Sequence, residues 1–184
     1  MPGKLVILSG PSGVGKDTVL DQWQATNPDV ERVVAYTSRS PRSGEREGVD
    51  YHFVSVEEFH RMAAAGEFLE FKEVHGNWYA TPLSGMQTIL DAGKIAVLKI
   101  DVQGALEVMP KLPNAITIFL LPPTLQELER RLRGRGSEDE ARIQKRLDNA
   151  KAELEAHRHY RFHLINQDIE YTVVQLSEIV RKAS

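Results

Sequence analysis

Cysteine is absent from the 184 residues of this chain. Disulfide bonds and metal sites built on thiolates are therefore excluded. Long hydrophobic runs are also missing, since none approaches the roughly 20 apolar residues that a membrane-spanning helix requires. The first apolar run, Leu5–Leu8, follows Met1 so closely that we expect no signal peptide. Together these absences predict a cytoplasmic protein with no membrane partner.

A strong excess of one charge is lacking as well. The chain carries 23 Lys and Arg residues against 26 Asp and Glu residues, for a net charge of −3. Because nucleic-acid binding draws on excess positive charge, we expect no nucleic-acid partner. Hydrophobic residues make up 41% of the chain and charged residues 27%, which is typical of a globular protein of one domain. The composition leaves the oligomeric state open.

Buried strands and amphipathic helices alternate along the chain. Runs that are apolar on both faces predict parallel strands at Leu5–Leu8, Ile95–Ile100 and Ile116–Leu121. Helical patterns lie between and after these runs, around Val19–Gln24, Leu83–Leu90 and Leu125–Leu132. This alternation predicts an α/β fold with a doubly wound parallel sheet. Two segments interrupt it: Ser38–Asp50, followed by short strand patterns through Thr81, and the highly charged span Arg130–Arg161.

A glycine-rich segment directly after the first strand predicts a phosphate-binding loop. The segment comprises Gly10, Pro11, Ser12, Gly13, Val14, Gly15, Lys16, Asp17 and Thr18. Glycines let backbone N–H groups converge on phosphate oxygens, the following helix adds the positive end of its dipole, and the lysine can reach the outer phosphates. The alternative is a turn that merely joins a strand to a helix. The apolar run before the loop and the helical stripe after it favour triphosphate binding.

The residue after the loop lysine departs from the usual pattern. A Ser or Thr hydroxyl is expected there as a Mg²⁺ ligand, and this chain has Asp17 instead. A carboxylate is a hard oxygen ligand that suits Mg²⁺ and is favourable near a helix N-terminus. We therefore hypothesise that Asp17 binds the metal, directly or through water.

Residues 35–81 predict a small, mostly β insert. Ser55 begins a capping box for a helix that ends near Gly66. Strict alternation in Phe68–Val74 predicts a strand with Phe68 and Glu70 on one face. Glu70 would then lie among apolar neighbours, which indicates either an edge position or a role in recognition.

An arginine-rich loop that contains Arg39 and Arg42 precedes Tyr51 in this insert. Guanidinium groups bind phosphate oxygens bidentately, and tyrosine hydroxyls can complete such a clamp. The alternative is a solvated loop whose charges contribute little. A second phosphate site near a phosphate-binding loop is what phosphoryl transfer to a phosphorylated acceptor requires.

In this combination the chain resembles the guanylate kinase family over nearly its full length. After the phosphate loop, the motifs that carry the resemblance are Thr37–Glu45, Gly48–Ser55, Gly66–Glu70, Gly76–Tyr79, Asp101–Gly104 and Arg131–Gly136. Several motifs in one order are far more specific than the loop alone. The resemblance implies a P-loop NTPase-type fold in one domain, with a core (1–34, 82–124 and 160–184), a GMP-binding insert (35–81) and a helical lid (about 125–159).

The resemblance also implies roles for individual residues. Those that would bind the GMP phosphate are Arg39, Arg42, Tyr51 and Tyr79, and those that would read guanine are Glu70, Thr81 and Asp101. The lid arginines that would close over the ATP phosphates are Arg131, Arg135 and Arg146, and Asn166 would lie near the adenine. Lys16, Arg39 and the lid arginines would be the catalytic residues. For Asp101 the alternative role is to cap the helix that follows.

Two positions depart from the family pattern: Ala35 replaces a frequent serine, and Lys99 replaces a frequent acid. Ala35 could soften base selectivity or be ordinary strand packing. The implied activity is transfer of the γ-phosphate of ATP to GMP, and to dGMP, with Mg²⁺ as cofactor and the two nucleotides as small-molecule partners.

Two other functions remain as alternatives. Ribose 1,5-bisphosphate kinases tend to carry Gly-Lys-Asp in this loop but have no use for guanine-reading residues. A non-catalytic guanylate-kinase-like module that binds proteins typically loses its phosphate loop, and this chain retains Lys16 and the lid arginines.

Overall fold

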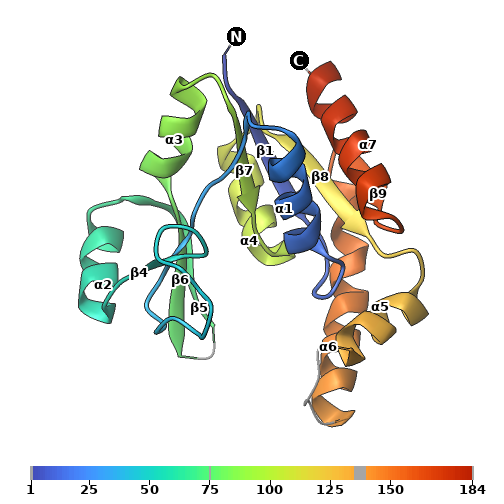
Figure 1. The fold of residues 1–184 in the computed structure, drawn as a ribbon. Helices are drawn as coiled ribbons and strands as arrows, with labels where there is room; N and C mark the ends of the chain where they lie inside the picture. The colour runs from blue at the N-terminus through green and yellow to red at the C-terminus, as the bar shows by residue number, and fades with distance from the viewer. Residues whose placement is uncertain (1, 75, 135–139, 184) are drawn as a thin grey trace.

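The computed structural model describes residues 2–74, 76–134 and 140–183. In this part of the chain, the central sheet has the strand order β2-β7-β1-β8-β9, and all neighbouring strands are parallel (Figure 1). The strands are β1 (Lys4–Ser9), β2 (Val30–Arg32), β7 (Ile95–Lys99), β8 (Ile116–Leu121) and β9 (Phe162–Ile165). The three apolar runs predicted as buried parallel strands are confirmed, and they lie side by side as β7, β1 and β8.

Helices cover both faces of the central sheet. The helices are α1 (Lys16–Thr26) and α7 (Ile169–Lys182) on one face, and α3 (Leu83–Asp91) and α4 (Val102–Val108) on the other. Successive side chains of β1 point to opposite faces, so Val6 and Leu8 enter one core and Ile7 enters the other. Each such buried side chain stabilises the fold by about 1.5–3 kcal/mol. The predicted doubly wound α/β architecture is therefore confirmed.

Residues between β2 and α3 form a second, smaller sheet, with the order β4-β3-β6-β5. Its elements are β3 (Tyr36–Thr37), β4 (His52–Phe53), α2 (Val56–Ala64), β5 (Phe68–Val74) and β6 (Asn77–Pro82). The predicted cap of α2 is confirmed, because the Ser55 hydroxyl accepts a hydrogen bond from the Glu58 N–H at 3.1 Å. Phe59 and Met62 of α2 pack with Phe68 and Ala80 in a separate small core.

Strand β5 departs from the strict alternation that the sequence predicts. Phe68 pairs with Pro82 and Glu70 with Thr81, so Leu69 is an extra residue in a β-bulge. The rings of Phe68 and Phe71 both contact Phe59, at centroid distances of 5.0 and 6.2 Å. The prediction that Phe68 and Glu70 share a face is therefore wrong. The bulge lets Phe68 stay in the core of the small sheet while Glu70 points elsewhere.

Two helices extend from the other side of the central sheet (Figure 1). They are α5 (Leu125–Arg133) and α6 (Glu140–Leu154), which pack through Leu128, Leu132, Ile143, Leu147 and Ala150. Short 3₁₀ helices, η1 (Met109–Lys111) and η2 (Glu155–His159), complete the described elements. The chain termini lie together at the end of the molecule away from the α5–α6 pair.

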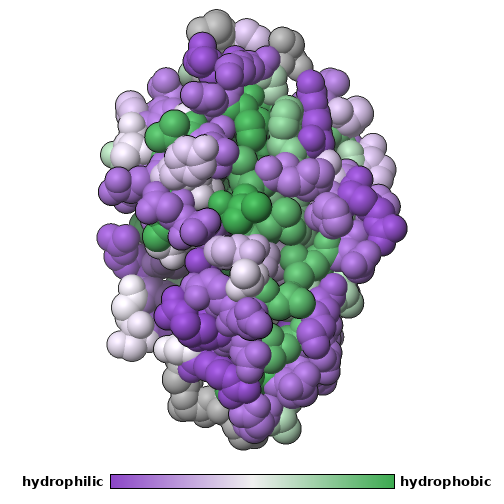
Figure 2. All heavy atoms as spheres, turned by 90° about the vertical axis from the view of Figure 1, so that its right-hand side faces the viewer, coloured by the Kyte–Doolittle hydropathy of each residue, from purple (hydrophilic) through white to green (hydrophobic). Residues whose placement is uncertain are grey.

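The surface of the side that carries α7 and β9 has an apolar band between hydrophilic side chains (Figure 2). Exposed apolar residues on these two elements include Ile165, Ile169 and Val174. Among the described residues, no helix combines the length and the apolar character that crossing a membrane requires.

Candidate active site

The glycine-rich loop follows β1, the central strand, at its carboxyl end. Open α/β sheets bind their ligands at this end of the strands. Gly13 has a φ of 85°, and a Cβ at this position would lie 2.7 Å from Leu132 Cδ2. The loop can therefore approach α5 closely only because this residue is glycine. Lys16 Nζ donates to the carbonyl oxygens of Gly10 and Pro11, so the lysine folds back over the loop.

Two side chains from outside the phosphate loop hold it in place through a single backbone carbonyl group, that of Val14. Val14 O accepts hydrogen bonds from Asn166 Nδ2 at 2.8 Å and from Arg131 Nη1 at 3.1 Å. Arg131 Nη2 also donates to Asn166 O, at 3.0 Å. Asn166, which follows β9, is 3% exposed. The sequence predicts Asn166 near the adenine, and in the structure its side chain supports the phosphate loop.

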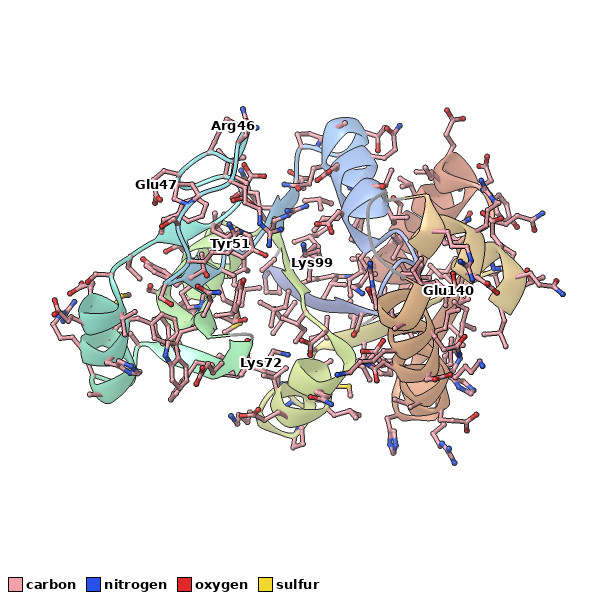
Figure 3. The ribbon with its side chains drawn as sticks, turned by 90° about the horizontal axis from the view of Figure 1, so that it is seen from below. Arg46, Glu47, Tyr51, Lys72, Lys99 and Glu140 are labelled. Atoms are coloured by element: carbon pink, nitrogen blue, oxygen red, sulfur yellow. The ribbon has the colours of Figure 1, made fainter. Side chains whose placement is uncertain are left out.

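A cavity of about 560 Å³ opens beside the loop, between the central and small sheets. Its polar lining consists of Ser12, Lys16, Arg42, Tyr51, Glu70, Lys72, Tyr79, Thr81, Lys99 and Asp101. Six of the seven residues predicted to bind GMP thus line one cleft together with the loop lysine. We call it the acceptor cleft. In Figure 3, Tyr51 lies on the side of the small sheet, and Lys99 lies between that sheet and α1.

The two predicted guanine-reading carboxylates meet around Gly104. A Cβ at this glycine would lie 3.4 Å from Asp101 Oδ1 and 3.7 Å from Glu70 Oε2. Glu70 Oε1 accepts a hydrogen bond from Thr81 Oγ1 at 2.7 Å. Asp101 Oδ1 accepts from the Gly104 N–H at 2.8 Å, which caps α4. The capping role considered for Asp101 is therefore confirmed, and its carboxylate also lines the cleft.

Lys72 also lines the cleft, although the sequence alone does not predict it there. Its Nζ forms an ion pair with Asp101 Oδ2. A lysine two residues after Glu70 in the same strand was the available signal, because residues two apart in a regular strand share a face. Burial raises the pKa of Glu70, and the Thr81 hydrogen bond and the charge of Lys72 only partly oppose this shift. Burial also lowers the pKa of Lys72.

Arg39 is not among the residues that line the acceptor cleft, but it lies next to Tyr51, which does line it. Its guanidinium forms two hydrogen bonds with the carboxylate of Glu45, each 2.9 Å long. Arg39 Cζ also lies 5.6 Å from the centroid of the Tyr51 ring, which contacts Tyr79 edge-on at 5.9 Å. The hydrogen bonds from Arg39 lower the pKa of Glu45 to about 2. Glu45 is thus the counter-ion of Arg39, a partner that the sequence alone does not predict.

A second cavity, of about 760 Å³, lies on the other side of the loop. Its lining includes Gly13, Gly15, Thr18, Arg131, Asn166 and Asp168. The loop thus separates two hollows, with Ser12 and Lys16 facing the acceptor cleft. We call the second hollow the donor cleft.

Helix α6 also reaches the loop. Arg146 Nη2 donates to Ser12 Oγ at 3.0 Å, and the Ser12 N–H donates to Glu153 Oε2 at 3.2 Å. A carboxylate therefore accepts a hydrogen bond from a loop amide of the kind that binds phosphate. Of the three predicted lid arginines, Arg131 and Arg146 contact the loop region, and Arg135 lies outside the described residues.

Asp17 is in the first turn of α1, and its carboxylate contacts two basic side chains. Lys99 Nζ donates to Asp17 Oδ1, and Arg32 Nη2 lies 3.7 Å from the same oxygen. Burial alone would raise the pKa of Asp17, but Lys99, Arg32 and Lys16 together lower it. Asp17 is therefore ionised at neutral pH. Among the described residues, no group of three or more His, Cys, Asp or Glu side chains is arranged to hold a metal ion.

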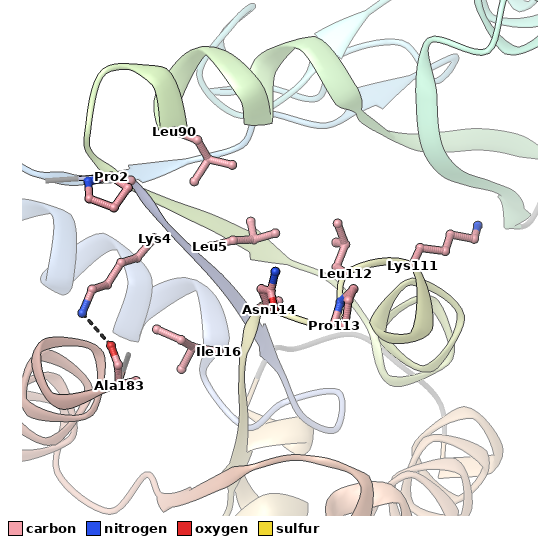
Figure 4. Close-up of a pocket in the computed structure, with 12 residues that line it drawn as sticks. Pro2, Lys4, Leu5, Leu90, Lys111, Leu112, Pro113, Asn114, Ile116 and Ala183 are labelled. Atoms are coloured by element: carbon pink, nitrogen blue, oxygen red, sulfur yellow. Dashed lines mark hydrogen bonds between the residues drawn. The ribbon is translucent and has the colours of Figure 1, made fainter.

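A third hollow, of about 630 Å³, lies at the opposite end of the central sheet (Figure 4). It is lined mainly by apolar side chains, including Leu5, Leu90, Leu112 and Ile116. Lys4 Nζ, at its edge, donates to Ala183 O at 2.7 Å. This hollow lies at the amino end of β1, far along the strand from the phosphate loop, and none of the predicted site residues lines it.

Comparison with known proteins identifies close relatives of the chain. The family model described as guanylate kinase matches residues 2–183. A guanylate kinase of Thermosynechococcus vestitus is 43% identical over 179 residues, which cover 97% of this chain and 94% of the relative. One of Aromatoleum aromaticum is 42% identical over 181 residues, covering 98% and 89%. The crystal structure of guanylate kinase from Anaplasma phagocytophilum matches with a TM-score of 0.75 at 34% identity, covering 98% of this chain and 85% of that one.

Proposed function

The chain belongs to the guanylate kinase family and transfers a phosphoryl group from ATP to GMP, and from this premise we propose how its two clefts divide the reaction. ATP binds with its phosphates in the loop formed by residues 10–15 and its adenosine in the donor cleft. GMP binds in the acceptor cleft. In domain terms, residues 35–81 are the GMP-binding insert, residues 125–159 are the lid, and the remaining residues are the core.

The observation that carries this assignment is the composition of the acceptor cleft. Glu70 and Asp101 lie around Gly104 at one end, and Arg42 and Tyr51 line the same cleft as Lys16. Carboxylates accept hydrogen bonds from the N1–H and N2 amino groups of guanine, whereas adenine presents the opposite pattern at that edge. A cleft with fixed acceptors at one end and cations at the other fits GMP.

At the phosphate end, Arg42 donates to the GMP phosphate together with the hydroxyls of Tyr51 and Tyr79. Arg39 joins them by turning from Glu45 or by sharing it. Thr81, which donates to Glu70 in this structure, can instead donate to guanine O6. These residues orient an oxygen of the GMP phosphate toward the γ-phosphorus of ATP, which is the main requirement of phosphoryl transfer.

On the donor side, Lys16 binds the outer phosphates of ATP, and Arg131 and Arg146 bind them from the lid. Arg135 is proposed for the same role from the sequence. Charge spreads over the oxygens of the transferred group, so cations placed around it lower the barrier. No side chain acts as a nucleophile in this scheme.

The residues present fit a Mg²⁺ ion that enters with ATP. Mg²⁺ usually keeps several waters and needs only one or two carboxylates beside the substrate phosphates. Asp17 offers an ionised carboxylate one residue after the loop lysine, and Lys99 binds only its Oδ1 oxygen. When bound, the ion would neutralise part of the charge on the ATP phosphates.

A panel of phosphoryl acceptors tests this assignment. In a coupled assay of ADP release, we expect the highest kcat/KM with GMP, activity with dGMP, and at least a thousandfold lower kcat/KM with AMP. Ribose 1,5-bisphosphate should give no activity above background, because it lacks a base for Glu70 and Asp101. Lys16→Ala should lower kcat with every acceptor. A preference for ribose 1,5-bisphosphate would contradict the proposal.

A further inference from the structure

The two positions at which the phosphate site departs from its family pattern are in direct contact. Asp17 stands where a hydroxyl is expected and Lys99 where an acid is expected. Lys99 is the last residue of β7, and it pairs in register with Leu8 of β1, just before the phosphate loop. Its Nζ donates to Asp17 Oδ1. The two departures therefore form one ion pair at the carboxyl ends of adjacent strands.

The ammonium group of this pair belongs to the reaction cleft. Lys99 lines the acceptor cleft together with Lys16 and Arg42, and its side chain is 22% exposed. Figure 3 shows it at the junction between the small sheet and α1. Lys16 of the phosphate loop and Arg42 of the insert line the same cleft as Lys99. A cation at this place would lie where the two substrate phosphates meet.

We propose that Lys99 is a further catalytic residue, which binds phosphate oxygens at the junction of ATP and GMP, and that Asp17 is the positioning residue that holds its ammonium there. The proposal rests on the placement of ATP and GMP given above. An oxygen of the GMP phosphate forms the new bond to the γ-phosphorus while the bond from that phosphorus to the ADP oxygen breaks. Lys99 keeps its protons throughout and acts as a hydrogen-bond donor.

The physical need for such a cation is the repulsion between two negatively charged phosphates that must come into contact. A fixed cation between them reduces this repulsion and stabilises the charge on the transferred group. Asp17 alone would add a negative charge beside the phosphates. Paired with Lys99, it adds no net charge and restricts a long, flexible side chain to one place.

The test compares Lys99→Met with a matched control, Lys94→Met. Lys94 immediately precedes β7, at the end of the strand opposite to Lys99, and it forms an ion pair with Glu31. We expect Lys99→Met to lower kcat about tenfold to a hundredfold, with KM for ATP and for GMP changed less than about threefold. Lys99→Arg should recover most of the rate, because it retains the charge. Lys94→Met should stay within about twofold of the parent.

A binding measurement separates this role from a general effect on the fold. An adenosine–guanosine pentaphosphate, in which one phosphate chain joins the two nucleosides, spans the junction, and calorimetry measures its affinity. Lys99→Met should weaken its binding about tenfold or more while ATP alone and GMP alone bind nearly as before. A kcat of Lys99→Met within twofold of the parent, or unchanged pentaphosphate binding, would overturn the proposal.

Asp17→Asn tests the positioning role. Because Asp17 acts through Lys99, the double variant Asp17→Asn with Lys99→Met should be no slower than Lys99→Met alone. The comparison is made at saturating Mg²⁺, because Asp17 is also the proposed Mg²⁺ ligand, and additive losses under that condition would overturn the positioning role. Lys16→Ala separates a failure of the Lys99 role from a failure of the ATP placement, because an active Lys16→Ala enzyme would contradict the placement of ATP itself.

Discussion

Individual carboxylates in this molecule differ in ways that follow from their surroundings. Glu70 is 8% exposed, and its burial raises its pKa. Asp17 lies next to Lys99 and Arg32, and its pKa is lowered. Glu45 is held by Arg39, which lowers its pKa to about 2. On acidification, Glu70 therefore takes up a proton before either of the other two.

The raised pKa of Glu70 leads to a prediction about pH. As the pH falls through this pKa, the carboxylate gains a proton and loses an acceptor for guanine, so kcat/KM for GMP should fall. The decline should begin above the pH expected for an ordinary glutamate, whose pKa is about 4.3. The folded state binds this proton more tightly than the unfolded chain, so protonation of Glu70 favours the fold.

The measurement is kcat/KM for GMP against pH, with thermal unfolding followed over the same range. Glu70→Gln supplies the control. We expect its kcat/KM for GMP at neutral pH to be at least a hundredfold lower, and its profile should lack the acidic decline. An identical decline in the variant would assign the titration to another group.

Among the elements, α4 shows how one residue serves both a helix and a binding cleft. Asp101 is the N-cap of α4 through Oδ1, while Oδ2 pairs with Lys72 of β5. The pair links the central sheet to the small sheet. The bulge at Leu69 provides a second link between the small sheet and the rest of the fold, because Lys111 Nζ of η1 donates a hydrogen bond to Leu69 O at 3.1 Å.

Two substitutions at Asp101 should separate its functions. Both variants lose the partly exposed ion pair with Lys72, which should lower the free energy of unfolding by about 1 kcal/mol or less. Asparagine caps helices about as well as aspartate, so Asp101→Asn should cost no more than this, whereas Asp101→Ala should lose about 1 kcal/mol more. Both variants lose the carboxylate, so both should raise KM for GMP at least tenfold. Urea unfolding and steady-state kinetics measure the two effects, and a normal KM in Asp101→Asn would contradict the guanine-reading role.

In the whole molecule, the phosphate loop is the point where the main parts of the fold meet. It follows β1, packs against Leu132 of α5, and is bound by Asn166 after β9 and by Arg146 of α6. The small sheet completes the acceptor cleft from the opposite side. Changes in α5 or α6 should therefore reach the chemistry through the loop.

Arg131 offers the clearest test of this coupling. Its guanidinium donates to Val14 O and Asn166 O and also pairs with Glu127. The guanidinium of its neighbour Arg133 pairs with the carboxylates of Glu129 and Glu140. Arg131→Met should lower kcat about a hundredfold or more, because it removes both the contact that holds the loop at Val14 O and a cation proposed to stabilise charge on the transferred group. Arg133→Met should remain within about threefold. Equal losses in the two variants, measured at saturating ATP and GMP, would argue against a specific role for Arg131.

The sequence by itself determined the features that depend on neighbouring residues. The strands β1, β7 and β8 follow from apolar runs, and the caps at Ser55 and Asp101 follow from hydrogen bonds across three residues. The family and its activity were also readable, because several motifs recur in one order along the chain.

Only the tertiary structure decided which charged residues meet. Lys72 and Asp101 are 29 residues apart and Lys99 and Asp17 are 82 apart, yet each pair is in contact. The bulge at Leu69 likewise depends on packing against both Phe59 and the central sheet, which no local pattern records. Such contacts are set by the way separate strands and helices pack, and a periodic pattern within one element carries no information about its partners.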